Sequence, residues 1–599
     1  MTKDKGQRTN TDVLVVGGGT GGTVAAIQAA RRGAKTILVS EFPWLGGMLT
    51  CAGVVAPDGN ELVSLQTGLW GAYLRELQQR QTGGLCGGWV SLSTYHPRTG
   101  AKIFEDWAKS IPNLQCIYGK TPVEVVKQGD RAIAVRFDDW EITAKIIIDG
   151  TELGDVLALA EVPHRWGWEL QGEFDEPSAP TELDGLCDRF PVQAPTWVFM
   201  LKEETGFWQR APEIPAPTRH NPEQFTGAWE GYGPEKFLNY GRLPGNLFMV
   251  NWPKCGNDYG ENLNRLVASE TAKTEFLQEA LWHSQSFARF IQTHFGRRYG
   301  LAKGTFPVSP SQKVAHPSGA FALHPYYRES RRLRGQTTVT ERDILPIAGG
   351  CVASLPQDST GEVSAIAIGN YANDHHYPGV KFPLQPKSMA WGGRQTGTPF
   401  AIPYSSLVPA TTEGLLVCEK NISVSHIANG ATRLQPMVMN IGQAAGMAAA
   451  LCVELKIQPQ ELPVRQLQEA LLGDAIAPAA VIPLLNLPPN HPEWLKWQYY
   501  YLDRPEAYPE TGICPCDSNF SSEIEVGECY RGTFRRIPPN GYRIRLTESQ
   551  EKKKIWSLIT VRPEVNEKLE QCAEGATITV WGSCNYSGGW LLVDKVVIS

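Results

Sequence analysis

Short apolar runs alternate with glycines near the start of the chain. Residues 12–16 (DVLVV) are a β-branched apolar run that ends at glycines, and an Ala-rich stretch with helical periodicity follows and ends at Gly33. A second apolar run, KTILVSE, ends at Glu41. The pattern predicts strand, tight turn, helix and strand, which is how an α/β fold with a parallel sheet begins.

The predicted turn carries a nucleotide-binding spacing. Gly17, Gly19 and Gly22 stand in G-x-G-x-x-G register, in which the glycines allow the tight turn, the approach of a pyrophosphate and close helix packing. The helix N-terminus would face the phosphates. Glu41 follows about 20 residues later, where a carboxylate can bind a ribose 2′-hydroxyl. The motif predicts an adenine dinucleotide and leaves open whether NAD or FAD is bound.

The remaining pattern divides the chain into parts. Three strand-like runs lead to Asp149, tryptophans and prolines then gather around one amphipathic helical run, and an Ala-rich helix follows near residue 445. A Pro-rich stretch precedes strand patterns that predict a small β-barrel. The expected parts are 10–165 and 326–470 for the nucleotide-binding domain, 166–325 for an inserted substrate or cap domain, 471–510 for a linker, and 511–599 for the barrel-like domain.

Composition narrows the setting. A chain of 599 residues with 42% hydrophobic content can bury a large core, and a net charge of −6 gives no basic field for nucleic acid. We find no apolar run of the roughly 18 to 20 residues that a membrane span needs. The 13 scattered cysteines favour reduced thiols. We expect a cytoplasmic protein that acts on a small molecule, with neither a nucleic-acid partner nor a metal site.

Six blocks in order resemble a known family. They are DVLVVGGGTGGTVAAIQAARRGAKTILVSEFPWLGGMLT, IIDGTELGDV, NWPKCGNDY, RESRRLRG, IGNYANDHH and the long block from IPYSSLVPATT to GQAAGMAAA. Together, over roughly residues 10–460, they resemble the FAD-dependent oxidoreductases related in fold to the succinate dehydrogenase and fumarate reductase flavoproteins. The resemblance implies a resident FAD and a Rossmann-like fold of the glutathione reductase type.

The resemblance also implies roles for particular residues. The N-terminal glycines and Glu41 would hold the ADP half, and Gly46, Gly47 and Met48 would lie beside the pyrophosphate and ribityl chain. Val123 and Asp155 would support the nucleotide-binding core. Gly442 and Gly446, in the late helix, would close over the isoalloxazine ring. The other positions expected to bind the cofactor are those of the glycine motif, Gly17, Gly19 and Gly22.

Arginines are the first candidates for substrate binding. Arg328, Arg331 and Arg332 stand together with Glu329, and guanidinium groups match carboxylates bidentately. An ordinary ion-pair network is an equally good interpretation for two of the three. Arg433 lies in NGATRL, which resembles a run whose arginine binds a substrate carboxylate in related flavoproteins. The residues after it, QPMVM, differ from that run, so specificity for dicarboxylates does not follow.

Histidines are the candidates for proton transfer. Asp374, His375 and His376 are consecutive, and a histidine beside a carboxylate can serve as an acid or base near neutral pH. A histidine held in a loop by ordinary hydrogen bonds fits the sequence equally well. His426 precedes the Ala-rich helix and is the second candidate. The residues predicted to be catalytic are therefore His376, His426, Arg433 and Arg331.

Two functions remain open from the sequence. The first is an FAD-dependent oxidoreductase that transfers hydride between the flavin and a small organic substrate, which could be anionic. Only one complete dinucleotide motif is present, so electrons would come from a bound substrate or a partner and not from NAD(P)H. The alternative is an electron-transfer subunit whose C-terminal domain docks an electron-acceptor protein. A flavin enzyme that modifies RNA lacks the expected basic patch.

Overall fold

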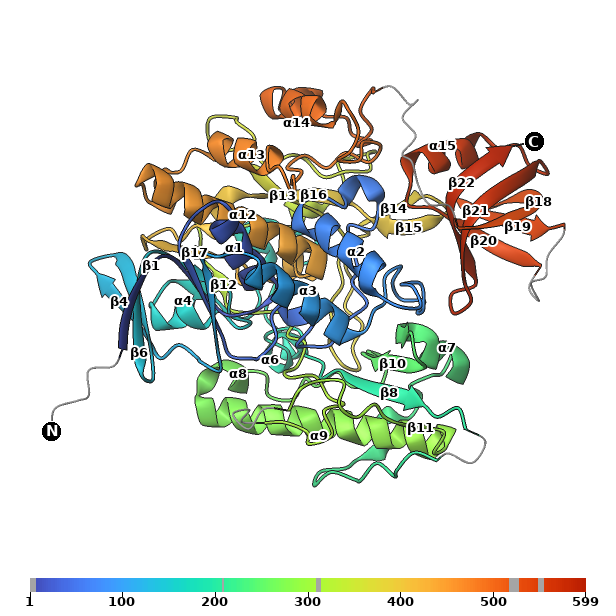
Figure 1. The fold of residues 1–599 in the computed structure, drawn as a ribbon, viewed down its shortest axis with the longest axis horizontal. Helices are drawn as coiled ribbons and strands as arrows, with labels where there is room; N and C mark the ends of the chain where they lie inside the picture. The colour runs from blue at the N-terminus through green and yellow to red at the C-terminus, as the bar shows by residue number, and fades with distance from the viewer. Residues whose placement is uncertain (1–6, 207–209, 309–313, 517–526, 548–553, 599) are drawn as a thin grey trace.

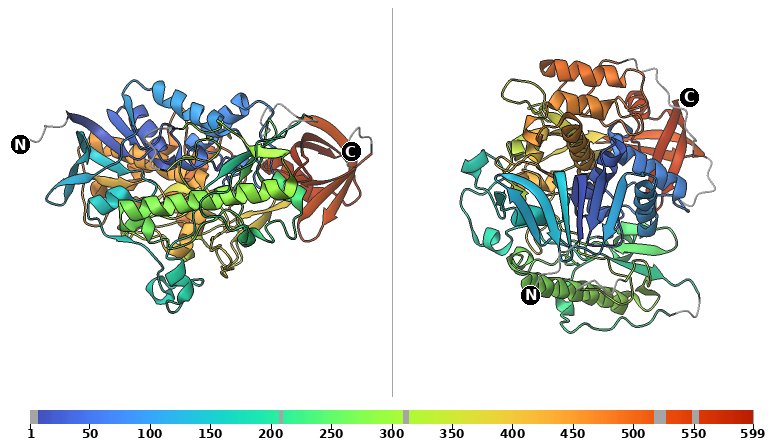
Figure 2. Two further views of the ribbon diagram at one scale, coloured as in Figure 1. Left: turned by 90° about the horizontal axis from the view of Figure 1, so that it is seen from below. Right: turned by 60° about the vertical axis from the view of Figure 1, so that its left-hand side comes forward.

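The computed structural model describes residues 7–206, 210–308, 314–516, 527–547 and 554–598. Figure 1 shows a central sheet covered by helices, a segment below it that contains one long helix, and a barrel at the C-terminal end. The early strands in blue and the late helix in orange lie side by side in all views (Figure 2). The part that contains the central sheet is therefore built from the two ends of a long stretch of chain.

A seven-stranded sheet forms the centre of this part. Its order is β3-β2-β1-β6-β5-β4, and β17 pairs with the second half of β6. The pairs β4–β5 and β5–β6 are antiparallel, and the pairs β1–β2, β2–β3, β1–β6 and β6–β17 are parallel. The strands are β1 (Gln7–Val16), β2 (Thr36–Ser40), β3 (Leu114–Tyr118), β4 (Glu124–Gln128), β5 (Arg131–Phe137), β6 (Trp140–Asp149) and β17 (Leu415–Val417). This parallel arrangement confirms the predicted α/β class.

Helices α1 (Thr20–Arg31) and α12 (Gln435–Leu455) pack closely against each other. A Cβ atom added at Gly442 would lie 2.4 Å from the Gly21 carbonyl oxygen, and one at Gly446 would lie 2.2 Å from that of Ala25. Both glycines therefore let the two helix backbones approach. Within the described ranges, α12 alone is long and apolar enough to cross a membrane, but 94% of its apolar window is buried, as in a core helix.

The other helices of this part lie around the sheet. The longer ones are α2 (Gly68–Arg80), α3 (Pro97–Lys109) and α13 (Val464–Leu472), and the shorter ones are α4 (Asp155–Leu159), α10 (Glu341–Ile344) and α11 (His426–Thr432). Two antiparallel pairs accompany them, which are β13 (Ala365–Asn370) with β16 (Pro399–Pro403) and the hairpin of β14 (Ser388–Trp391) and β15 (Arg394–Gly397).

The segment between the two parts of the sheet has its own small sheet. Its order is β11-β8-β10-β9, and the long helix α9 (Glu270–Phe295) runs beside it (Figure 2). The Ser269 side chain caps the start of α9, and Gly296, with φ +82°, ends it. The remaining elements are β7 (His164–Arg165), α5 (Gln171–Phe174), α6 (Gly185–Arg189), β8 (Phe199–Glu203), α7 (Pro234–Leu238), β9 (Arg242–Leu243), β10 (Leu247–Val250), α8 (Arg265–Ala268), β11 (Tyr299–Leu301) and β12 (Arg332–Leu333).

The segment 471–510, expected to be a linker, packs against the rest of the protein. Val481, Ile482 and Leu487 are fully buried, and α14 (Trp494–Asp503) follows them. Both backbone amides of Val481 and Ile482 donate to the side chain of Gln498. The stretch is thus a structured connection.

The C-terminal strands close into a barrel of order β18-β19-β20-β22-β21. Its contacts with the rest of the protein include backbone groups: Thr560 N–H donates to the Gly392 carbonyl at 2.9 Å, and Asn585 Nδ2 donates to the Gly88 carbonyl at 2.7 Å. The turn of the β14–β15 hairpin therefore lies against the barrel. The barrel elements are β18 (Glu528–Ile537), β19 (Gly541–Leu546), β20 (Ile555–Ile559), α15 (Pro563–Gln571), β21 (Thr577–Asn585) and β22 (Trp590–Ile598).

Candidate functional site

Backbone packing at the end of β1 forms a narrow cradle. Gly17 has φ +105°, and a Cβ added there would lie 2.2 Å from the Gly150 carbonyl oxygen. A Cβ at Gly22 would lie 2.1 Å from the Gly17 oxygen, and one at Gly19 would lie 2.4 Å from Glu419 Oε1. No larger residue fits at these positions without movement. The glycine motif thus gives a tight strand-turn-helix whose first helical residues, Thr20 to Gly22, are buried.

The first turn of α1 binds an acidic group. Gly19 caps the helix without a side-chain hydrogen bond, and Gly21 N–H donates to Glu419 Oε1 at 2.6 Å. Lys420 Nζ lies 3.0 Å from Glu419 and 2.7 Å from Glu152. Burial alone would lower the pKa of Lys420, but these two carboxylates raise it above its ordinary value. The helix start therefore already holds a carboxylate, as the partial positive charge of a helix N-terminus favours.

A tight loop after β2 lies against this helix start. Gly46 and Gly47 both have positive φ, at +103° and +48°. Gly46 N–H donates to Thr23 Oγ1 at 2.9 Å, and the N–H of the buried Met48 donates to Thr20 Oγ1 at 3.1 Å. The loop continues to Val54, whose carbonyl accepts from Gln435 at the start of α12. The loop therefore connects the cradle to the first turn of α12.

The other predicted cofactor residues lie at the edges of this region. Glu41 is exposed at the end of β2, and Val123 is 47% exposed, with its N–H bonded to the Arg136 carbonyl. Asp155 begins α4 and pairs with Arg331 at 3.0 Å. Arg331 thus sits beside α4, apart from the group around Arg433.

Arg433 lies at the centre of a second group of polar side chains. Its side chain is 2% exposed, and Nη2 donates to Asp374 Oδ2 at 3.1 Å while Nη1 donates to the Tyr326 hydroxyl. Its Nε has no hydrogen-bond partner among the residues that the structure describes. The Arg433 guanidinium is thus buried, charged and only partly hydrogen-bonded.

His376 lies between two carboxylates. Its Nδ1 is 2.8 Å from Asp258 Oδ2, and its Nε2 is 3.0 Å from Asp374 Oδ2. Although burial alone would raise it, the charges of Arg328 and His376 hold the pKa of Asp258 at about 2. Ionised carboxylates can only accept, so a His376 that carries hydrogen on both ring nitrogens would satisfy both contacts. His376 and Asp374 are part-exposed, at 13% and 41%, whereas Asp258 is buried, so this group is approached from the side of Asp374.

Arg328 completes the group, which we call the reaction-side cluster: Arg328, Arg433, His376, Asp258, Asp374 and Tyr326. Arg328 Nη2 lies 3.2 Å from Asp258 Oδ1. The Arg328 and Arg433 guanidinium carbons lie 4.8 and 5.8 Å from the centre of the Tyr326 ring. Two arginines therefore lie against one tyrosine, which directly follows the inserted segment.

Asp58 faces the same cluster and was not identified from the sequence. Burial raises its pKa well above the ordinary value, and the charges of Glu61 and Asp374 add to this effect while Arg433 opposes it. Burial raises the pKa of Tyr240, and the negative charges of Asp58 and Asp374 add to this effect. Sequence reasoning also missed Asp258 and Tyr326. The available signal was the block NWPKCGNDY, which contains Asp258 but has no spacing typical of a known chemistry.

His426 belongs to an inner network. Its Nε2 contacts the Tyr377 hydroxyl at 2.6 Å, and its Nδ1 contacts Glu329 Oε1 at 2.8 Å. Arg332 pairs with Glu169 at 2.8 Å and with Glu329 at 3.0 Å. Of the clustered arginines, Arg328 therefore joins the reaction-side cluster, whereas Arg331 and Arg332 take part in other ion pairs.

Cys51 is a buried thiol beside the loop after β2. Burial raises its pKa to about 12, and its Sγ lies 3.2 Å from the Trp44 carbonyl. A thiol that stays protonated at neutral pH is a poor nucleophile. Cys51 therefore acts as a small core residue.

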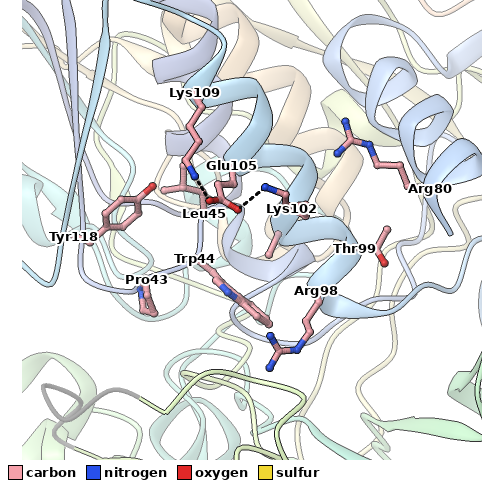
Figure 3. A pocket seen from close by; sticks show the side chains of 11 residues that line it. Pro43, Trp44, Leu45, Arg80, Arg98, Thr99, Lys102, Glu105, Lys109 and Tyr118 are labelled. Carbon is pink, nitrogen blue, oxygen red and sulfur yellow. Dashed lines mark hydrogen bonds and ion pairs between the residues drawn. The ribbon is translucent and has the colours of Figure 1, made fainter.

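A surface pocket of about 670 Å³ lies between α3 and the loop after β2 (Figure 3). Its charged side chains pair with one another: Glu105 accepts from Lys102 at 3.2 Å and from Lys109. The Arg98 guanidinium lies over the Trp44 ring at 5.8 Å. Self-paired, solvent-exposed charges contrast with the buried charges of the reaction-side cluster.

The chain belongs to the FAD dependent oxidoreductases, because the model of that family matches residues 12–471. This confirms the resemblance seen in the sequence and makes the protein an FAD-dependent oxidoreductase. No protein with a curated description matches the sequence.

Three solved structures are distant likenesses of this chain. A geranylgeranyl bacteriochlorophyll reductase-like protein from Thermoplasma acidophilum is 10% identical over 84% of this chain and 89% of that one, with a TM-score of 0.33. Quinol fumarate reductase from E. coli is 14% identical over 78% and 75%, with a TM-score of 0.28. GidA from Aquifex aeolicus is 20% identical, but this chain spans only 25% of its length (23% of this chain), with a TM-score of 0.19. Such scores carry no information about substrate.

Proposed function

We propose that this oxidoreductase transfers hydride between FAD and a small organic substrate that carries an anionic group, and that the reaction-side cluster binds that group. The supporting observation is an imbalance of buried charge. Arg328, Arg433 and doubly protonated His376 face the carboxylates of Asp258 and Asp374. Because burial favours the neutral form of Asp58, one positive charge is left over. A substrate anion would balance it.

The described residues fit FAD. The glycine cradle and the start of α1 suit a pyrophosphate, and we assign Glu41, Gly46, Gly47 and Met48 to the same nucleotide. Buried side-chain atoms of Asn429 and Gln435 have no partner among the described residues, and both flank Arg433 in sequence. Such atoms suit a polar ring system at the first turn of α12. When bound, FAD supplies the acceptor and donor of hydride.

The protein's own residues would position the substrate and manage one proton. Arg433 has an Nε–H without a partner in the described part of the chain, which can complete a two-pronged contact with a carboxylate. When the substrate gains hydride, His376 would supply the proton, because both its nitrogens carry hydrogen. Asp374, on the open side, would keep His376 oriented.

The inserted segment would act as the cap of this site. It contributes Asp258, and Tyr326 directly follows it; its backbone is hydrogen-bonded to the loop after β2, where Leu323 N–H donates to the Cys51 carbonyl at 2.8 Å. A cap of this kind excludes water and lowers the local dielectric constant, which strengthens the contact between arginine and substrate. We place the protein in the cytoplasm and assign it a small-molecule substrate.

An anaerobic screen tests the proposal. The FAD-loaded protein is mixed with small organic acids and, as matched controls, with the amides of the same acids, and flavin absorbance is followed. We expect at least one acid to bleach the flavin and its amide to be slower by about 10- to 100-fold, the value of one charge-assisted contact. Equal rates for an acid and its amide would refute an anion site.

A further inference from the structure

Four side chains behind the reaction-side cluster form a continuous hydrogen-bonded chain. In order they are His375, Tyr377, His426 and Glu329, and we call them the proton chain. The Tyr377 hydroxyl lies 2.7 Å from His375 Nδ1 and 2.6 Å from His426 Nε2, and His426 Nδ1 lies 2.8 Å from Glu329 Oε1. Each contact is short enough to require one hydrogen between its two atoms.

Each end of the proton chain contacts a backbone group that can act only as an acceptor or only as a donor of a hydrogen bond. At the outer end, His375 Nε2 lies 3.0 Å from the Ile427 carbonyl, which can only accept, so this nitrogen carries hydrogen. At the inner end, Glu329 Oε2 accepts from the Gln193 N–H at 3.1 Å. The hydrogens between these ends can therefore be counted.

The count requires one extra proton. Suppose that both histidines were neutral and Glu329 were ionised. His375 Nδ1 would then carry a lone pair, and the single ring hydrogen of His426 would sit on Nδ1 and be donated in the hydrogen bond to Glu329. The single Tyr377 hydrogen would then face two ring lone pairs and could bond only one of them. Adding one proton, on Glu329 or on either imidazole, satisfies all three short contacts.

We propose that the proton chain stores this one extra proton, and that losing it breaks one of the two hydrogen bonds of Tyr377 and loosens the segment 374–377. The segment alternates between the two networks, because Asp374 and His376 belong to the reaction-side cluster whereas His375 and Tyr377 belong to the proton chain. The protonation state of Glu329 thereby controls the position of Asp374 and His376. Glu329, His426 and Tyr377 are positioning residues.

Burial decides where the stored proton resides. Burial raises the pKa of Glu329 to about 7, although Arg332 opposes this shift. It lowers the pKa of His375 to about 3 and that of His426 well below its ordinary value. Glu329 is therefore the holder, and release begins near neutral pH. The other ionisable groups that face the proton chain from neighbouring elements are Arg332, Glu169, Arg165, Glu176, Arg433 and Cys187.

The variant Glu329→Gln removes the titratable proton but keeps the hydrogen bond to His426. The glutamine amide has the shape of the protonated acid and donates a hydrogen to His426 Nδ1 at every pH. Glu176→Gln is the matched control, because burial also raises the pKa of Glu176 to about 7 but its Oε1 accepts from Ser425 and the Glu341 N–H, outside the proton chain.

Two measurements on the FAD-loaded protein test the proposal without a substrate. Infrared spectra between about pH 5.5 and 8.5 should show protonated-carboxyl absorption that decreases on raising the pH; the component due to Glu329 should be missing in Glu329→Gln and kept in Glu176→Gln. Hydrogen exchange of residues 371–380, corrected for intrinsic rates, should lose about 2- to 10-fold protection over the same range in the wild type and in Glu176→Gln. Glu329→Gln should keep its protection.

Three outcomes would overturn the proposal: a wild type without the Glu329 component of the carboxyl absorption, a pH-dependent loss of protection that persists in Glu329→Gln, or one that is abolished by Glu176→Gln. Should Glu329→Gln fail to fold, Tyr377→Phe replaces it, because without the hydroxyl the loss of protection must vanish. The effect on catalysis rests on the proposed function and predicts a KM that rises with pH only in chains that keep Glu329. Failure of that kinetic test alone leaves the proton count standing and refutes the anion site.

Discussion

The proposed nucleotide cradle and the proposed substrate site, the reaction-side cluster, would use opposite means of recognition. The cradle consists of backbone, because Gly17, Gly19 and Gly22 leave no room for side chains and the helix start supplies N–H groups. The cluster consists of side chains that carry charge, such as Arg433 and Asp374. A site made of closely packed backbone is sensitive to steric clash, so a single added methyl group should abolish binding. A site made of charged side chains should lose affinity stepwise, because each hydrogen bond contributes separately.

The largest expected effect is at the cradle. Gly22→Ala places a methyl group 2.1 Å from the Gly17 oxygen, so the strand-turn-helix must open, at a cost of about 1 to 3 kcal/mol or more. We expect purified Gly22→Ala to lose most of its FAD, measured from the ratio of flavin to protein absorbance. Gly172→Ala, where the added atom meets nothing within 4 Å, is the control. Full FAD content in Gly22→Ala would show that FAD binding does not require the tight backbone packing at Gly22.

The second effect is at the cluster. Arg433→Lys keeps the charge but loses the planar two-pronged contact, so kcat/KM for the acid found in the screen should fall about 10- to 100-fold with an unchanged flavin spectrum. Arg342→Lys alters an exposed pair with Asp175 and should match the wild type. Unchanged kinetics with lower thermal stability in Arg433→Lys would make Arg433 a structural ion-pair residue.

A third, smaller effect concerns pH and stability. Glu329 and Glu176 have pKa values of about 7 in the folded protein, above the ordinary value of 4.5. The folded state therefore binds these protons more tightly than the unfolded state, so their contribution is complete below about pH 4.5 and is lost as the pH rises through about 7. The lowered pKa values of His375 and His426 act in the opposite direction over this range, so the test is the difference between variants: relative to Glu329→Gln, the wild type should lose a few degrees of Tm between about pH 5 and 8. The same pH dependence of Tm in the wild type and in Glu329→Gln would contradict the assignment.

The smallest effect lies far from both regions, where the barrel meets the rest of the protein. Asn585→Ala removes the hydrogen bond to the buried Gly88 carbonyl, which should lower the free energy of unfolding by about 1 kcal/mol. FAD content and kcat/KM should stay at wild-type values, as measured by absorbance and steady-state rates. A loss of flavin in this variant would show that the barrel supports the cradle.

The same contrast explains what could be predicted. The cradle lies in one contiguous stretch, so glycine spacing, strand and helix could be recognised together. The reaction-side cluster joins residues from distant segments, and Asp258 and Tyr326 carry no local pattern. Arg433 and His376 were identified because resemblance and residue type singled them out. The sequence could not show that Arg331 pairs with Asp155, or that His426 faces Glu329, since both depend on tertiary packing. The four consecutive polar residues Asp374, His375, His376 and Tyr377 alternate between the two networks, and this pattern is the sequence signal that could have indicated both.

The buried helix α12 also bears on how the chain is made. Its apolar surface is long enough to be taken for a membrane span, yet its main partner α1 precedes it by some four hundred residues. During synthesis from the N-terminus, the surface that covers α12 has therefore left the ribosome long before α12 appears. The order of segments along the chain thus shortens the time for which this long apolar helix is exposed to water.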